Sequence, residues 1–254
     1  MLPVRIVCVA LLSASLLTAC SRSTDRLLQG WVEADLIFVS PDEAGRVETL
    51  SVREGDRVEK STPLFAVDDD LQKADLAIKQ AALTTAQQNY NRAQELVRTS
   101  AGTQKALEDA DAGLRQAKAN LDASQTRLTR RRAVSPDTGT IQQVYFRPGE
   151  TVPAARPVVS LLPPKNLKIR FFAPQAMLPQ IKIGQSVGVS CDGCAPNLTA
   201  KISFIAGSAE FTPPVIYSLE ERAKLVFLIE ARPDDPEKFR VGQPVSVALP
   251  ELSK

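Results

Sequence analysis

Apolar side chains recur at every seventh position through the middle of the chain, from residue 68 to residue 133. Small residues, mostly alanine, hold the second apolar position of most heptads, and the stretch has no proline and only two glycines. The pattern predicts two long helices that pack along a narrow coiled-coil seam and turn near residues 99–102. The seam positions are Leu76, Leu83, Tyr90, Val97, Leu107, Leu114, Leu121 and Leu128, with Ala86, Ala93, Ala110, Ala117 and Ser124 at the second positions.

Charged residues cluster at the two ends of this helical stretch. Three aspartates, Asp68 to Asp70, suit the start of the first helix, where acidic side chains meet the positive end of the dipole. Three arginines, Arg130 to Arg132, suit the end of the second helix for the opposite reason. Each helix of about 30 residues would be roughly 40 to 45 Å long.

The segments on either side of the helical stretch are similar to each other. Residues 39–42, Val-Ser-Pro-Asp, are matched by residues 134–137, and later pairs such as Gly55 and Gly149 keep one offset of 94 residues. The second copy therefore reads as having lost one residue between its aspartate and its next glycine. Each copy alternates short apolar runs with turns, and its glycine suits a turn position with positive φ. One copy cannot cover its own apolar face, so we predict that the two copies face each other in one small β-domain.

The remainder of the chain, from residue 166 to residue 250, alternates apolar and polar residues as β-strands do. A second repeat occurs here, because residues 181–189 parallel residues 239–247 and both contain Gly-Gln-x-Val. The sequence therefore predicts a mainly β protein with one long helical insertion.

Composition excludes several classes of function. The net charge is +2 and aromatic residues make up 5%, which leaves no electrostatic or stacking surface for nucleic acid. The chain has no histidine, so it lacks the usual general base, imidazole metal ligand and Ser-His-Asp arrangement. No glycine-rich phosphate loop occurs. We therefore expect a protein that is not an enzyme and that needs no cofactor or metal.

The N-terminus has the features of an export signal. Arg5 precedes an apolar run from residue 6 to residue 17, and small residues lead to Cys20. This resembles the lipobox of bacterial lipoproteins, which implies cleavage of residues 1–19 and acylation of Cys20. A weak transmembrane helix or a plain secretory signal is the alternative, although the run is short for a membrane span.

Cys191 and Cys194 are separated by two residues and follow a strand-like run. In an exported protein such a pair is expected to close a small loop as a disulfide. The alternative is a redox-active Cys-x-x-Cys pair, which needs a helix N-terminus to lower a thiol pKa, and no such helix is predicted here. Two cysteines without further ligands also make a poor zinc site.

The two β-rich copies resemble the split biotinyl/lipoyl-like domain of the HlyD or membrane fusion protein family. The similarity covers residues 45–65, Gly-Arg-Val through Val-Arg-Glu-Gly-Asp-Arg-Val to Pro-Leu-Phe, and their second copy. In carrier domains the halves meet at a hairpin that presents a lysine for biotin or lipoate. Here the junction is Asp68 to Asp70 followed by the helical stretch, so a swinging-arm enzyme component is disfavoured.

The resemblance implies a domain order for the whole chain. It implies a barrel-sandwich hybrid with a helical hairpin inserted, followed by an antiparallel β-barrel. Residues 209–214 and 222–227 resemble the barrel segment of adaptors associated with ABC-type exporters. The implied parts are a signal peptide (1–19), a lipid anchor with linker and first strand (20–38), a split lipoyl-like domain (39–67 and 134–165), the hairpin (68–133) and the barrel (166–250).

The predicted turn between the helices carries a candidate docking motif. In the family, an Arg, a Leu four residues later and a Ser seven residues after that meet the helical barrel of a TolC-type duct. Arg92 and Leu96 match this pattern, whereas Thr103 stands at the serine position. The structural alternative is that Thr103 caps the second helix, Leu96 joins the seam and Arg92 is a solvated helix residue.

The resemblance implies a periplasmic adaptor that works as a homo-oligomeric ring. Its partners would be an inner-membrane transporter, expected to be ABC-type, and a TolC-type outer-membrane channel, with the Cys20 lipid in the inner membrane. Ser21 follows Cys20 where the best-known retention signal has aspartate, so outer-membrane sorting stays open. An adaptor of a proton-driven pump and a lipid-anchored solute-binding protein are the alternatives.

Overall fold

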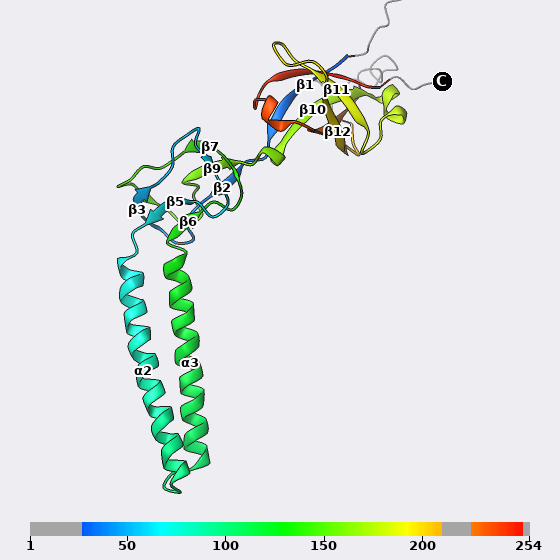
Figure 1. The fold of residues 1–254 in the computed structure, drawn as a ribbon. Helices are drawn as coiled ribbons and strands as arrows, with labels where there is room; N and C mark the ends of the chain where they lie inside the picture. The colour runs from blue at the N-terminus through cyan, green and yellow to red at the C-terminus, as the bar shows by residue number, and fades with distance from the viewer. Residues whose placement is uncertain (1–26, 210–224, 251–254) are drawn as a thin grey trace, which may run out of the picture. The chain divides into compact units, whose positions relative to one another are not determined.

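The computed structural model describes residues 27–209 and 225–250 (Figure 1). The expected signal peptide, Cys20, Ser21 and most of the segment compared with ABC-associated adaptors lie outside these residues. The chain forms two compact units: one is Ala34–Leu167, and the other runs to Glu33 and resumes at Lys168. Each unit is described by itself below.

The unit Ala34–Leu167 contains two four-stranded antiparallel sheets. One sheet has the order β2, β9, β7, β4 and the other has the order β6, β5, β3, β8. The strands are β2 (Ile37–Val39), β3 (Gly45–Leu50), β4 (Arg57–Val58), β5 (Pro63–Val67), β6 (Arg132–Val134), β7 (Gly139–Val144), β8 (Thr151–Val152) and β9 (Val159–Leu162).

The two halves of this domain are joined by reciprocal backbone pairing. The N–H of Gly55 donates to the carbonyl of Ile141 at 2.8 Å, and the N–H of Gly149 donates to the carbonyl of Val47 at 2.8 Å. Gly149 lies 94 residues after Gly55, and Ile141 lies 94 residues after Val47. The two bonds are therefore equivalent, and an internal twofold symmetry relates the two copies. Gly55 and Gly149 have φ of 90° and 95°, which confirms the predicted turn positions.

The strand register corrects the alignment of the two copies by one residue. Val39 pairs with Val159, and the equivalent pair on the other sheet is Ala133 with Phe65. Ala133, and not Val134, is therefore the counterpart of Val39. No residue has been lost between the strand and the following glycine, and the Ser-Pro-Asp motif is instead displaced by one position in the second copy.

The core of the split domain draws on both copies, as the sequence predicts. Equivalent residues such as Val47 and Ile141, or Val58 and Val152, are buried together between the sheets. Neither copy could bury these side chains alone, because each of the two sheets that enclose the core contains strands of both copies. The core residues are Val47, Val52, Val58, Leu64, Phe65, Val67, Ile141, Val152, Val158, Val159 and Leu161.

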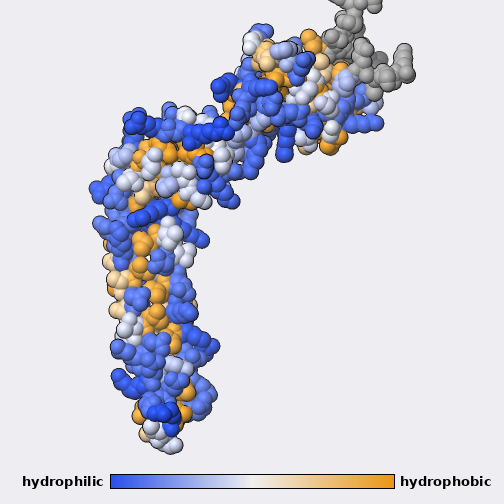
Figure 2. Space-filling view, in the orientation of Figure 1, coloured by the Kyte–Doolittle hydropathy of each residue, from blue (hydrophilic) through white to orange (hydrophobic). Residues whose placement is uncertain are grey.

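A pair of long helices, α2 (Asp70–Arg98) and α3 (Gln104–Thr129), connects β5 to β6. The helices pack side by side (Figure 1), and every apolar seam position from the heptads is half-buried. Ser124 is the only residue of the two helices that is buried. Figure 2 shows a hydrophobic band along the half of this helix pair nearer the sheets, and mainly hydrophilic residues beyond it.

Ser124 fixes the register of the helix pair through a hydrogen bond that the heptad pattern does not reveal. Its hydroxyl donates to Oδ2 of Asp75 at 2.8 Å, and Nζ of Lys79 lies 3.6 Å from Oδ1 of the same carboxylate. The bond from Ser124, followed by the charges of Lys79 and Arg127, lowers the pKa of Asp75 below its ordinary value.

The second unit is a closed six-stranded barrel, which confirms the mainly β fold class. Its order is β1, β10, β13, β12, β11, β14, and β1 pairs with β14 to close it. Residues 27–34, assigned from sequence to a linker and first strand, thus form a barrel strand. The strands are β1 (Leu27–Ala34), β10 (Leu167–Pro174), β11 (Ser186–Ser190), β12 (Leu198–Ile205), β13 (Val226–Pro233) and β14 (Pro244–Ala248), with short 3-10 turns η1 (Pro164–Asn166), η2 (Gln175–Gln180) and η4 (Pro236–Lys238).

Cys191 and Cys194 lie directly after β11, where a disulfide joins them with a Cα–Cα distance of 5.3 Å. The side chain of Gln243 donates to Sγ of Cys194 at 3.3 Å. No helix among the described residues is long and apolar enough to cross a membrane.

We predict that Ser124→Ala destabilises the helix pair in a pH-dependent way. Because the folded-state pKa of Asp75 is lowered, its stabilising contribution is present above its unfolded pKa and is lost as the pH falls through the folded value. Urea unfolding followed by circular dichroism should show the difference from wild type shrinking as the pH falls below the ordinary pKa of an aspartate. Thr126→Ala, which removes an exposed hydroxyl bonded within α3, is the control and should show no such trend.

Candidate functional site

The tip of the helix pair is closed by backbone bonds to a single carbonyl. Helix α2 ends at Arg98, and the carbonyl of Leu96 accepts from the N–H groups of Ala101 at 2.8 Å and Gly102 at 2.9 Å. Ser100 supplies the left-handed residue that such a helix end requires, with φ of 58°. The turn therefore folds back directly onto Leu96.

Gly102 permits this close approach. A Cβ added at Gly102 would lie 2.9 Å from Cβ of Leu96 and 3.1 Å from the backbone of Val97. Any side chain at this position would push the turn away from Leu96. Glycine is thus required here by contact, in a conformation that other residues could otherwise adopt.

Thr103 is the N-cap of α3, as the structural alternative for this residue expects. Its backbone is extended and its Oγ1 accepts a hydrogen bond from the N–H of Ala106 at 3.2 Å. The cap occupies an acceptor site of the hydroxyl and leaves its hydrogen able to donate to another molecule. Capping and docking are therefore compatible for Thr103.

Leu96 does not join the seam, contrary to the structural alternative for that residue. Its side chain is 43% exposed, whereas its neighbour Val97 takes the half-buried seam position. Arg92 is exposed one turn earlier, and residues four apart lie on the same face of a helix. The structure therefore presents an exposed leucine and an exposed arginine on one face of α2. The backbone of Leu96 is bonded to the turn that leads to Thr103.

An ion pair that the sequence reasoning missed adds to this tip. Arg98 donates to both carboxylate oxygens of Glu95, at 2.7 and 2.9 Å, and this bond raises the pKa of Arg98. Glu95 and Arg98 are three residues apart on an exposed helix, a spacing that could have predicted the pair. The tip thus combines the exposed side chain of Leu96 with a bidentate ion pair.

The root of the helix pair is held by Arg131, whose side chain is 6% exposed. Its guanidinium donates to the carbonyl of Asp68 from Nε at 2.8 Å and also from Nη2, and to the carbonyls of Glu43 and Ala44 at 3.3 and 3.2 Å. A Cβ at Gly45 would collide with the same guanidinium. Arg131 therefore ties the entry to α2, the exit from α3 and the start of β3 together.

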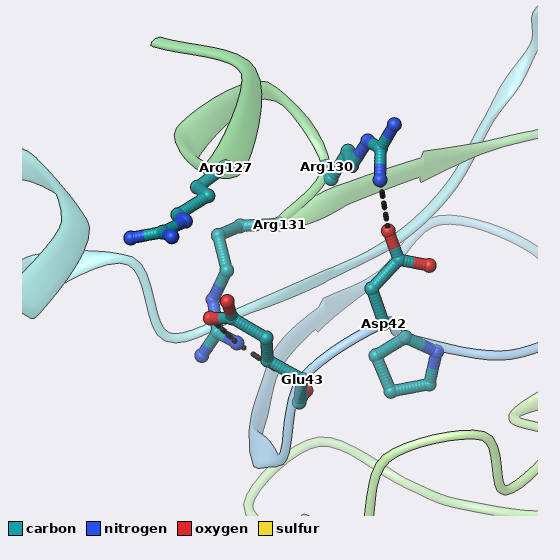
Figure 3. A pocket seen from close by; sticks show the side chains of 6 residues that line it. Asp42, Glu43, Arg127, Arg130 and Arg131 are labelled. Atoms are coloured by element: carbon teal, nitrogen blue, oxygen red, sulfur yellow. Dashed lines mark hydrogen bonds and ion pairs between the residues drawn. The ribbon is translucent and has the colours of Figure 1, made fainter. Parts of the chain in front are cut away.

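The arginine cluster therefore does more than meet the end of α3. Helix α3 ends at Thr129, and Arg130 forms an ion pair of 3.1 Å with Asp42, whereas Arg132 begins β6. Figure 3 shows Arg127, Arg130 and Arg131 around a pocket beside Asp42 and Glu43. The expectation that all three arginines serve the helix dipole was wrong, because Arg131 is buried and bonded to carbonyls of other segments.

The aspartates at the start of α2 differ in burial and in their contacts. Asp69 is the N-cap position and is buried, with Nζ of Lys73 at 2.5 Å from its carboxylate and Arg132 at 3.8 Å. The bond to Asp69 is the main cause that raises the pKa of Lys73. Asp70 is the first residue of the helix and stays exposed. In the described residues no group of three or more acidic or cysteine side chains is arranged to hold a metal ion.

The chain is similar in sequence to several known proteins. No model of a known protein family matches the chain. A UPF0194 membrane protein of Acidithiobacillus ferridurans is 32% identical over 176 residues, covering 67% of this chain and 52% of the relative. The UPF0194 membrane protein YbhG of Salmonella arizonae is 25% identical, covering 89% of both chains. The chain spans about half the length of the first of these relatives.

Solved structures define the fold class. The membrane fusion protein Spr0693 from Streptococcus pneumoniae matches with a TM-score of 0.71 at 18% identity, covering 89% of this chain and all of that one. A MacA-MexA chimeric protein with the MexA α-hairpin domain of Pseudomonas aeruginosa matches with a TM-score of 0.70 at 20% identity, covering 89% of this chain and 79% of that one. The chain therefore has the fold of membrane fusion proteins. Its homologues in sequence are UPF0194 membrane proteins.

We predict that Arg131→Ala strongly destabilises the unit Ala34–Leu167. The substitution leaves three carbonyls without their charged donor, and hydrogen bonds to charged groups stabilise by about 1.5 to 3 kcal/mol each, so a loss of at least about 2 kcal/mol is expected. Chemical denaturation measures it. Arg130→Ala is the matched control, because its exposed ion pair contributes at most about 1 kcal/mol. Equal effects of the two substitutions would contradict the role given to Arg131.

We also predict that Thr103→Ala lowers the stability of the helix pair by about 1 kcal/mol through loss of the N-cap. Thr103→Ser keeps an acceptor oxygen and should behave like the wild type. Thermal unfolding followed by circular dichroism tests both variants. If Thr103→Ala were as stable as the wild type, the capping bond would have no energetic role.

Proposed function

We propose that the chain is the periplasmic adaptor of an efflux or secretion system, in the lipoprotein branch of the HlyD or membrane fusion protein family. It would link an inner-membrane transporter to a TolC-type outer-membrane duct and would have no enzymatic activity of its own. The observation that carries the proposal is the exposed tip of a long helix pair that emerges from a split β-domain. The membrane fusion protein fold of the described residues supports it.

The helix pair is proposed to act as a coiled-coil hairpin that reaches the duct. Its helices have 29 and 26 residues, and their seam side chains are only half-buried. Such a pair buries little apolar surface for its length, so stability within the chain does not explain why it is long. Reach toward a partner does, and the exposed Leu96 at its end supplies an apolar contact for that partner.

The junction at which a carrier domain would present its lysine supports a non-enzymatic role. Val67 ends β5, and Asp68 to Asp70 lead directly into α2. The carbonyl of Asp68 is bonded to Arg131, and Asp69 is buried in ion pairs. The junction thus serves to hold the helix pair, and no lysine is displayed there for biotin or lipoate.

The remaining parts of the proposal concern the membrane side. Acylation of Cys20 would hold the adaptor in the inner membrane on its periplasmic side, and a homo-oligomeric ring would cover the thin flanks of the units. An ABC-type partner is favoured over a proton-driven pump by the resemblance of residues 209–214 and 222–227 to ABC-associated adaptors.

Substitutions at the tip test the proposal. We expect Arg92→Glu and Leu96→Ala to weaken binding to the duct by roughly tenfold or more, because central interface residues commonly contribute that much. Cross-linking of the helix tip to the duct and export of substrate should both fall, while circular dichroism shows unchanged folding.

Lys118→Glu is the control for charge reversal, because Lys118 is exposed on α3 well away from the tip. Unchanged cross-linking and export in both tip variants would overturn the docking role. Thr103→Asn separates the two roles of that residue, since asparagine caps a helix but lacks the hydroxyl.

A further inference from the structure

The outer surface of the barrel is divided by charge. On β1, β14 and β11, which are adjacent, the side chains alternate between buried inward positions and outward positions. None of the nine outward residues on the paired lengths of these strands is charged, although 24% of the chain is charged. We name this surface the neutral face; it consists of Leu27, Gln29, Trp31, Pro244, Ser246, Ala248, Ser186, Gly188 and Ser190.

Apart from Glu33, the charged residues of the barrel strands lie on the other three strands. Outward residues of β10 and β13 form ion pairs, with Lys168 at 3.2 Å from Glu230 and Arg170 at 2.7 Å from Glu33. Glu33 lies on β1 beyond the last residue that pairs with β14. The charged residues therefore border the neutral face, and the guanidinium of Arg170 reaches its edge at Trp31.

Two large apolar side chains are exposed on the neutral face. Leu27 is 50% exposed and Trp31 is 37% exposed, and they lie on the same side of β1. The Trp31 ring packs 5.8 Å from that of Phe172, and the guanidinium of Arg170 lies 5.9 Å from the Trp31 ring centroid. Trp31 is thus held in place with part of its ring still exposed.

The distance along the chain to Cys20 points to the occupant of this face. Leu27 lies seven positions after Cys20, and an extended chain over seven positions reaches at most about 25 Å. An acylated Cys20 would therefore keep the start of β1 close to the lipid headgroups. Tryptophan with neutral polar neighbours is the composition that the membrane–water interface favours.

We propose that the neutral face rests on the headgroup region of the membrane that holds the Cys20 lipid. The inference depends on the lipid anchor of the proposed function and adds a second, protein-to-lipid contact to it. The residues of the neutral face are uncharged, and the guanidinium of Arg170 beside Trp31 is paired with Glu33. This contact should therefore depend little on salt and on anionic lipid, unlike that of a polybasic surface.

Trp31 is the single tryptophan of the chain and reports the contact directly. The acylated full-length protein is reconstituted into phosphatidylcholine vesicles with and without brominated phosphatidylcholine. We expect brominated lipid to reduce Trp31 emission roughly twofold, and the emission to shift to shorter wavelength, as for an interfacial tryptophan. Both effects should persist in high salt.

A matched pair of variants places the contact on the neutral face. Ser246→Glu adds a charge between Gln29 and Ser190 and should abolish quenching, whereas Ser203→Glu, on the outside of β12, should leave it unchanged. Equal quenching of the two variants, or free access of acrylamide to Trp31 in vesicles, would overturn the inference.

Other occupants give different results. A blue shift that depends on protein concentration without lipid would assign the face to a second copy, and protection of Trp31 only after addition of the transporter would assign it to that protein. Intact mass distinguishes failure of the lipid anchor from failure of the lipid contact of the neutral face. Unmodified Cys20 overturns the anchor and this inference together, whereas acylated Cys20 with intact export but no quenching overturns this inference alone.

Discussion

The reciprocal backbone bonds between the two halves of the split domain determine how the rest of the chain is placed. The bonds from Gly55 and Gly149 close a sandwich that neither half could form alone. That closure leaves two equivalent strand pairs, β5 with β6 and β2 with β9. The helix pair is inserted at the first of these pairs, and the chain enters and leaves the domain through the second. One internal symmetry thus provides both points of attachment.

The sequence predicts this architecture well because its signals are periodic. Heptads place the helix pair, and the 94-residue repeat places the split domain, since each reflects a repeated burial of apolar groups. The role of β1 in closing the barrel was missed, because a strand that pairs with residues more than 200 positions away has no local signature. The alignment paired Val39 with Val134, whereas the structural counterpart of Val39 is Ala133. The error arose because the Ser-Pro-Asp motif is displaced by one residue relative to the strand in the second copy.

At the candidate site the sequence identifies residues better than it identifies their contacts. The heptad spacing alone does not decide whether Leu96 is exposed or whether Thr103 caps α3. Both depend on the backbone conformation of the turn. The burial of the Arg131 guanidinium could not be predicted, because its acceptors are main-chain carbonyls, which every residue type has. Polar contacts of this kind depend on a tertiary structure already formed, whereas apolar periodicity precedes it.

The insertion of the helix pair between β5 and β6 has an evolutionary consequence. Both ends of the insertion are fixed by strand pairing and by Arg131, so the length between them is free to change if α2 and α3 change together. Adding one heptad to each helix would preserve every seam contact and lengthen the pair by about 10.5 Å. Relatives of this chain could therefore carry helix pairs that differ in length by whole heptads, with the β-domain unaltered.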